Sequence, residues 1–234
     1  MIEDLEFETY LSISTSKFGI YLFDVRNLKN LYKQELILEN QTDDIDYKSL
    51  KNFLDSNIFK IEKLIGKFIK NIFIVIDNKK ILRLNIGIKK KNYNVSNKKD
   101  HIINSLTEIK DLFKLNYRNQ KIIHMFVNKY LINDKIYLSY EDNLKYDKIA
   151  LEIQIISISV EKINDLNKIL EDYQINIVKY FDYIYIKNFF EKLDLDISEM
   201  AHKIKGGYNL NEVMVVPKNS KKQAFFEKFF QLFS

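Results

Sequence analysis

The spacing between apolar residues changes along the first third of the chain. Three short runs rich in Ile, Leu, Phe and Tyr are separated by polar turns, which predicts an antiparallel strand meander at residues 8–14, 18–24 and 31–38. Between residues 50 and 69 the apolar positions recur every three or four residues, which predicts a long helix. Residues 72–76 form a continuous apolar run, typical of a strand buried on both faces.

The same changes of spacing continue to residue 205 and predict an α/β fold with mixed sheets. Residues 81–88 alternate apolar and polar side chains, as a half-buried strand does. Gly206 and Gly207 are a stop signal for the last helix of this part. The remaining strands are expected at 122–132, 136–138, 149–160 and 175–178, and helices at 102–113, 163–170, 183–193 and 198–205.

The C-terminal residues 224–234 are expected to form a two-faced helix that lies on a membrane surface. At 100° per residue, one arc collects Phe225, Phe226, Phe229, Phe230, Leu232 and Phe233. Lysines that would attract anionic lipids lie in and before this segment, at Lys218, Lys221, Lys222 and Lys228. The segment is shorter than the roughly 20 apolar residues that cross a bilayer. The alternative is that the helix packs on its own domain or on another protein.

Composition narrows the class of protein. Hydrophobic residues make up 46% of the 234 residues, enough for a sizeable core, and the absence of cysteine excludes disulfides and thiolate zinc sites. The acidic first eight residues lack a signal-peptide core, so a cytoplasmic location is expected.

The formal net charge of +5 raises the possibility of nucleic-acid binding. Nearly all of the basic residues are lysines, with arginine only at 26, 83 and 118, whereas recognition of phosphate and bases favours arginine. We therefore expect no nucleic-acid partner. A basic nucleic-acid-binding protein that uses the loop of residues 89–99 stays as the third hypothesis.

Motifs for catalysis are missing from the sequence. No glycine-rich phosphate loop and no Gly-x-Ser-x-Gly turn occurs, and the three histidines lack metal-ligand spacing. His124 lies inside an apolar strand and is expected to be a hydrogen-bonded core residue. Helix capping and solubility are the expected roles of Asp43, Asp44, Asp46, Asp194 and Asp196. The sequence thus predicts no enzyme, no catalytic residues, no metal and no cofactor.

Several segments together resemble the N-terminal half of FtsA, the actin-like cell-division protein of bacteria. Residues 10–24 are similar to the first hairpin of that family, normally written L-D-I-G-T-S-K, whose turn holds nucleotide phosphates. Residues 99–134 are similar to its inserted SHS2 (1C) subdomain. Further matching segments are residues 71–77, 142–152 and 163–170.

The resemblance implies half of an actin-like (RNase H-like) fold with an inserted strand-helix-strand-strand SHS2 subdomain and a C-terminal amphipathic helix. Residues 1–79 would begin subdomain 1A, residues 80–160 would form the SHS2 unit, and residues 161–193 would return to 1A. Residues 194–223 would be a linker, followed by the membrane-targeting helix at 224–234.

Departures from the family affect the phosphate hairpin. The aspartate of the motif falls on Ser12 and its glycine on Ser14, while Thr15, Ser16 and Lys17 remain. A serine hydroxyl is a weaker ligand for a hard divalent cation than a carboxylate. Only about 40 residues follow Leu193, which leaves no room for the second half of an actin fold. We therefore expect a degenerate hairpin that neither binds nor hydrolyses ATP.

The function that the resemblance implies is a non-catalytic division adaptor at the division site, on the cytoplasmic side of the inner membrane. The SHS2 unit would contact later division proteins and support self-association. Direct contact with FtsZ is not expected, because in the family the FtsZ tail docks on the other half. The alternative is an actin-like assembly platform of a pilus or secretion system, which shares the same subdomains.

Overall fold

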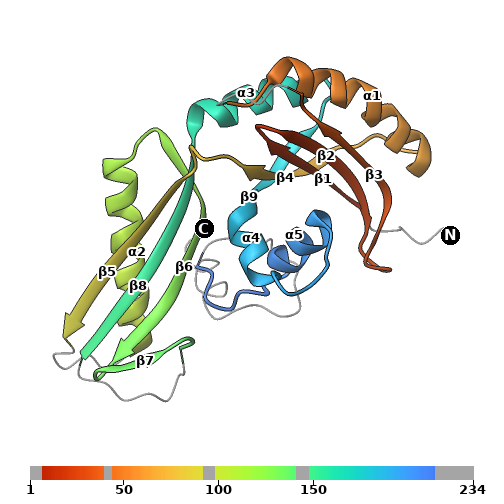
Figure 1. The fold of residues 1–234 in the computed structure, drawn as a ribbon. Helices are drawn as coiled ribbons and strands as arrows, with labels where there is room; N and C mark the ends of the chain where they lie inside the picture. Colours follow the sequence, from red (N-terminus) through yellow and green to blue (C-terminus); the bar gives the residue numbers. More distant parts are fainter. Residues whose placement is uncertain (1–6, 40–43, 92–97, 141–147, 214–234) are drawn as a thin grey trace. The chain divides into compact units, whose positions relative to one another are not determined.

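A computed structural model describes residues 7–39, 44–91, 98–140 and 148–213 (Figure 1). The fold is mixed α/β, as predicted, with a five-stranded and a four-stranded sheet. Contacts divide the chain into unit 1, residues 1–80 with 161–204, and unit 2, residues 81–160 with 205–234. The divisions at 80/81 and 160/161 lie next to the boundaries expected for the inserted subdomain.

Unit 1 is built on a sheet with the strand order β3-β2-β1-β4-β9. The first three strands form an antiparallel meander, and β4 and β9 run parallel to β1. The strands are β1 (Phe7–Ser14), β2 (Lys17–Asp24), β3 (Lys29–Ile37), β4 (Asn71–Asp77) and β9 (Asn176–Asp182). The helices are α1 (Tyr47–Ile65), α3 (Val160–Glu171), α4 (Tyr183–Phe189) and α5 (Ile197–Lys205).

Helices cover both faces of this sheet, with α1 and α3 on one face and α4 and α5 on the other (Figure 1). Two phenylalanines of β2 illustrate the packing on the two faces of the sheet. Phe18 lies 6.1 Å from the ring of Phe53 on α1, and Phe23 lies 5.1 Å from His202 on α5. Because both faces are covered, the central strands β1, β2 and β4 are almost continuously buried.

A capping side chain sets the start of helix α1, and a glycine sets its end. The Asp46 side chain accepts a hydrogen bond from the Ser49 N–H, which satisfies a free donor of the first turn. Gly66 ends the helix with φ +68°, a conformation that favours glycine. The predicted helix was therefore too long at its C-terminus, because the apolar spacing continues to residue 69 while the chain turns at Gly66.

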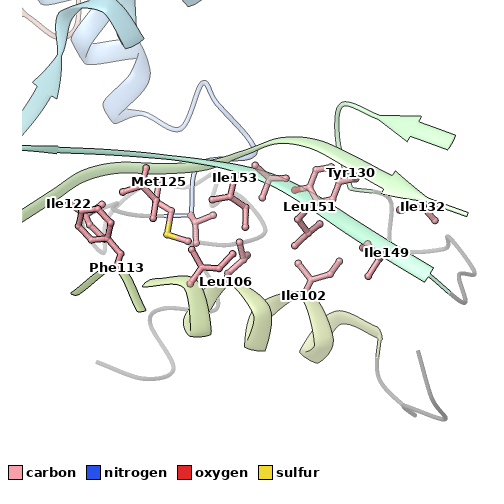
Figure 2. Packing of buried hydrophobic residues seen from close by; sticks show 14 residues of the cluster. Ile102, Leu106, Phe113, Ile122, Met125, Tyr130, Ile132, Ile149, Leu151 and Ile153 are labelled. Atoms are coloured by element: carbon pink, nitrogen blue, oxygen red, sulfur yellow. The ribbon is translucent and has the colours of Figure 1, made fainter. Parts of the chain in front are cut away.

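Unit 2 packs one helix on an antiparallel sheet with the order β5-β8-β6-β7. The elements are β5 (Leu82–Lys91), α2 (Lys98–Asn116), β6 (Gln120–Ile132), β7 (Lys135–Tyr137) and β8 (Lys148–Ser159). Figure 2 shows Ile102, Leu106 and Phe113 of α2 against the inward row of β6 and β8, including Met125 and Ile153. Assignment of this unit to the SHS2 class stays a prediction.

The predicted linker at 194–223 differs from the structure in its first part. Residues 197–205 form α5, which agrees with the helix that the apolar spacing predicts at 198–205 and not with a linker. Beyond it, the Val213 N–H donates to the Met125 carbonyl at 2.7 Å, and the Val127 N–H donates to the Asn211 carbonyl at 3.1 Å. Residues 209–213 thus lie along the edge of β6. The bridge between Phe126 and Glu212 and the burial of the Val213 side chain hold them there.

Two further boundaries differ from the sequence pattern. Strand β9 extends to Asp182, four residues past the predicted end, because Lys179 to Asp182 continue the pairing with β4. Helix α4 ends at Phe189, earlier than the predicted residue 193. The predicted helix at 224–234 lies outside the described residues.

Candidate functional site

The candidate site is the β1–β2 hairpin at the carboxyl end of β1. In the parallel pairing, Ser14 lies level with Asp77 at the end of β4, and Ile76 lies level with Asp182 at the end of β9. Carboxyl ends of parallel strands are the usual place for ligands in α/β folds. This is also where the resemblance places nucleotide phosphates.

A cavity of about 170 Å³ opens beside the hairpin. Pockets that enclose cofactors and drug-sized ligands are typically about 300–1,000 Å³, so this cavity is small by comparison. It is lined by Ser12, Ile13, Ser14, Ser16, Lys17, Val75, Asp77, Tyr183 and Ile197. Thr15, the remaining hairpin residue, is partly exposed in the turn and does not line the cavity.

The Ser14 hydroxyl closes the hairpin turn upon itself. Its Oγ accepts hydrogen bonds from the Lys17 N–H at 2.8 Å and the Ser16 N–H at 3.2 Å. It also donates to the Lys17 carbonyl at 2.9 Å. A turn that cradles phosphate presents its backbone N–H groups to the anion. Here Ser14 engages two of those groups, in the place where the resembled family has a glycine without a side chain.

Lys17 is held by the neighbouring strands of the sheet. Its ammonium group lies 2.8 Å from a carboxylate oxygen of Glu35 on β3, and the Tyr21 hydroxyl donates to the other Glu35 oxygen at 2.7 Å. Burial and the Glu35 hydrogen bond raise the pKa of Tyr21 well above its usual range. Burial acts to raise the pKa of Glu35, but its hydrogen bonds from Lys17 and Tyr21 outweigh this and lower it. The hairpin lysine therefore already has an anionic partner.

Ser12 lies on the same face of the sheet as this network. Its Oγ donates to the Gly19 carbonyl at 3.5 Å. A Cβ at Gly19 would meet the Ser12 Oγ and the Tyr21 hydroxyl at 2.6 Å, so a larger residue there would force these side chains to shift. The position where the resemblance to FtsA would place a carboxylate is thus occupied by a neutral hydroxyl in a closely packed site.

Sequence reasoning missed Glu35 and Asp77 as members of this site. The alternation of β2 places Lys17, Gly19 and Tyr21 on one face, but only the pairing of Gly19 with Glu35 brings the carboxylate to that face. Asp77 was assigned only to the end of a strand. Among residues 7–39, 44–91, 98–140 and 148–213, no group of three His, Cys, Asp or Glu residues is arranged to hold a metal ion.

The other polar residues that the sequence singled out serve structural contacts. His124 is fully buried and its Nδ1 lies 2.8 Å from a Glu212 carboxylate oxygen, which confirms a hydrogen-bonded core histidine. His202 lies 2.9 Å from Glu8. Asp44 forms ion pairs with Lys80 and Lys162 rather than a helix cap.

Asp196 directly precedes α5, but its carboxylate contacts β3 instead of capping the helix. It accepts a hydrogen bond from the Asn30 side chain at 2.8 Å and forms an ion pair with Lys33. Asp43 and the side chain of His101 lie outside the described residues.

The predicted membrane-binding residues also lie outside the described residues. These are Lys221, Lys222, Phe225, Phe226, Lys228, Phe229, Phe230, Leu232 and Phe233. Within the part of the chain that the structure describes, no helix combines the length and the apolar character needed to cross a bilayer. Part of the basic loop at 89–99 is likewise not described.

No protein-family model matches the chain, and no curated protein matches it at a significant level. Among solved structures, the chain is similar to one chain of a "PilM-PilN type IV pilus biogenesis complex", with 8% identity and a TM-score of 0.50. That match covers 78% of this chain and 49% of the other.

A Bacteroides thetaiotaomicron protein described as having an actin-like ATPase fold and unknown function matches at 15% identity. It covers 82% of this chain and 60% of the other, and its TM-score of 0.37 is too low to carry an argument. The chain thus spans only about half to three fifths of the structures that it resembles. The first likeness concerns the fold alone, and it agrees with the mixed α/β architecture described above.

Proposed function

We propose that this chain is a non-catalytic, actin-like adaptor that recruits other proteins at a membrane surface and does not use ATP. The observation that carries the proposal is the Ser14 hydroxyl, which accepts hydrogen bonds from the N–H groups of Ser16 and Lys17. A nucleotide phosphate would have to displace this hydroxyl before it could reach either donor.

Two further features support a closed hairpin. Lys17 would have to leave Glu35, which lies 2.8 Å away, before it could neutralise a phosphate. The adjoining cavity of about 170 Å³ is also below the range of about 300–1,000 Å³ that is typical of cofactor pockets. A protein with the architecture of a nucleotide-binding fold, but with its phosphate turn filled by its own side chain, is suited to act as a binding scaffold.

Attachment to the membrane is assigned to residues 224–234, on the cytoplasmic side of the inner membrane. The Phe-rich arc would enter the headgroup boundary, while the lysines at 221, 222 and 228 would attract anionic lipids. Deletion of residues 222–234 should release the protein from anionic liposomes, and a Phe229→Ser variant should weaken binding with the lysines intact. Undiminished co-sedimentation of the deleted protein with liposomes would contradict this assignment.

The first candidate for the process served is cell division, as the resemblance of the hairpin and of residues 99–134 to FtsA implies. A fluorescent fusion viewed in dividing cells should form a midcell band that is lost when residues 222–234 are removed. A uniform cytosolic signal would count against the division role.

The second candidate is an assembly platform for a pilus or secretion system. The likeness to a chain of a PilM-PilN type IV pilus biogenesis complex favours this candidate. Gene neighbourhood separates the two, because division and cell-wall genes favour the first candidate and pilus genes favour the second.

A further inference from the structure

Strand β5 is an edge of the sheet in unit 2. Within the described residues it pairs with β8 on one side and with no strand on the other. An edge strand presents unpaired backbone N–H and C=O groups along its outer side, which can pair with a strand from another molecule. Ten residues of β5 provide a long edge of this kind.

An apolar groove runs beside this edge, between β5 and α2. Four aliphatic side chains of β5 contact the core of unit 2 but are only partly buried, namely Leu82, Leu84, Ile86 and Ile88. The groove has a volume of about 300 Å³ and is lined by Ile86, Ile109, Leu112, Phe113, Asn116 and Tyr117. On α2, Leu112 is 51% exposed and Leu115 is 62% exposed. A strand added to β5 would direct every second side chain toward this groove.

Gly87 lies in the middle of β5 and is exposed. A Cβ built at this position would meet no atom within 4 Å, so no internal contact of the described structure requires glycine. Glycine weakens a strand, and in strand interiors it often marks a place where another backbone approaches closely. Its position on an edge strand is consistent with such an approach.

The charge of this region favours an anionic partner. The sequence of β5 contains Arg83, Lys89, Lys90 and Lys91 and no acidic residue. Lys90 already pairs with Glu108 of α2 at 2.7 Å, so we base the preference for an anionic partner on the other basic residues. Residues 81–160 contain 14 basic and 8 acidic residues, a net charge of +6. Residues 1–80 with 161–204 contain 18 basic and 22 acidic residues, a net charge of −4. The positive charge is therefore a property of the unit that carries the open edge.

We propose that β5 and α2 form a docking site for an acidic, extended peptide segment of a partner protein. The segment would pair with β5 as an additional strand and place alternate apolar side chains beside Ile86 and Leu112. Its acidic residues would face the basic side chains of β5. The proposal rests on the proposed function as a recruiting adaptor and names the chemistry of the partner.

A selection experiment tests the docking site. A phage library of random dodecapeptides is panned on the full chain, with counter-selection on a Leu112→Asp variant. We expect enriched peptides that are rich in Asp and Glu and that alternate acidic and apolar positions. Absence of enrichment over the variant, or enrichment without acidic residues, would overturn the proposal.

The enriched peptide, synthesised with a fluorescent label, then measures the effect of each variant on affinity. Leu112→Asp should weaken binding by at least about tenfold, and Lys89→Glu by a few-fold. Matched controls on α1 of unit 1 are Leu64→Asp, at a leucine that is 55% exposed, and Lys60→Glu, at an exposed lysine. Both controls should leave affinity unchanged. Equal loss in the controls would mean that binding depends on overall charge or folding, which overturns the site.

Three measurements distinguish a bound peptide from the other possible occupants of the groove. Hydrogen exchange should show protection of β5 amides when the peptide binds, since added strand pairing covers them. If Leu112→Asp instead dissociates a dimer in sedimentation, the groove holds a second copy of this chain. If the variant instead loses binding to anionic vesicles, the groove contacts lipid. Either result would overturn the peptide site, whereas ATP binding would refute the non-catalytic adaptor without affecting the peptide result.

Discussion

The hairpin of unit 1 and the outer edge of β5 in unit 2 differ in whether their hydrogen-bond donors already have partners. At the hairpin, Ser14 engages the amides of Ser16 and Lys17, and Glu35 engages the Lys17 ammonium group. Along β5, the outer backbone groups have no partner strand within the described residues. The place where an α/β fold ordinarily binds a ligand is thus closed, while an edge beside an apolar groove is open.

Under the proposed function, this difference separates a closed hairpin from an open surface for recruitment. The single hydroxyl of Ser14 is sufficient to satisfy two N–H donors of the β1–β2 turn. The two units also differ in net charge, which is −4 for unit 1 and +9 for unit 2, of which +6 lies in residues 81–160. An acidic unit discourages phosphate, and a basic unit favours an acidic partner.

The largest expected effects come from truncating a central core residue in each unit. Ile74 on β4 and Ile155 on β8 are both fully buried. Each change to alanine should lower the free energy of unfolding by about 2–5 kcal/mol, because it leaves a cavity in a close-packed core. Denaturant unfolding monitored by hydrogen exchange should locate Ile74→Ala effects in unit 1 and Ile155→Ala effects in unit 2.

Val178→Ala on β9, at an exposed position, is the control for both core variants and should have little effect. If Ile74→Ala and Ile155→Ala accelerated exchange equally across the whole chain, the two units would unfold as one, and the comparison would lose its structural basis.

The next largest effect is expected at Glu212, which holds residues 209–213 on unit 2. Its carboxylate lies 2.8 Å from the Nδ1 atom of the buried His124. Glu212→Ala should lower stability by about 1–3 kcal/mol, because it removes a buried hydrogen-bonding partner. Amide exchange at Val213 should accelerate, since its N–H donates to the Met125 carbonyl.

Glu199→Ala provides the matched control, because the partly exposed Glu199 pairs with Lys203 one helical turn away at 3.4 Å. Such pairs contribute about 0.2–0.5 kcal/mol. Equal effects of the two substitutions would mean that the buried contact does not anchor the segment.

A smaller effect is expected when the hairpin is opened. Ser14→Ala removes the hydroxyl that accepts from the Ser16 and Lys17 amides and should lower stability by about 1 kcal/mol. Exchange at those two amides should accelerate. Ser56→Ala on α1 is the control, since its hydroxyl donates only to the Asn52 carbonyl and alanine favours a helix. Unchanged amide exchange in Ser14→Ala would show that the turn is not closed by this side chain.

The smallest effect concerns Asp44, which pairs with Lys80 and Lys162 in unit 1. Burial acts to raise the pKa of Asp44, but hydrogen bonds from Lys162 and Lys80 outweigh it and hold the pKa well below the ordinary value of 3.8. A lowered pKa contributes stability that is present above that value and is lost as pH falls below it. Because Asp44 is half exposed, the contribution should be at most about 1 kcal/mol.

Thermal unfolding of Asp44→Asn and the unchanged protein checks the sign of this effect. The variant should be less stable at about pH 7, and the difference should shrink toward about pH 2. A difference that grew on acidification would contradict the assigned ion pairs.

Periodicity was sufficient to predict most elements, because α1, β4 and β8 carry long and regular apolar patterns. It could not predict contacts that depend on another part of the chain. Residues 209–213 contain little apolar periodicity and pair with β6 only through tertiary contacts.

The same limit applies to the candidate site. The sequence identified the hairpin and its departures at Ser12 and Ser14, which lie where the cavity forms. It did not identify Glu35 as the partner of Lys17, because strand register decides which side chain lies across from Gly19. The filling of the turn by Ser14 also depends on hydrogen-bond geometry that spacing does not specify.

Titration calorimetry of the full chain with ATP and magnesium tests the central claim most directly. The closed hairpin predicts no saturable heat when ATP is added, because the two amides and Lys17 are already engaged by Ser14 and Glu35. A dissociation constant in the low micromolar range would contradict the account and return the chain to the class of nucleotide-binding proteins.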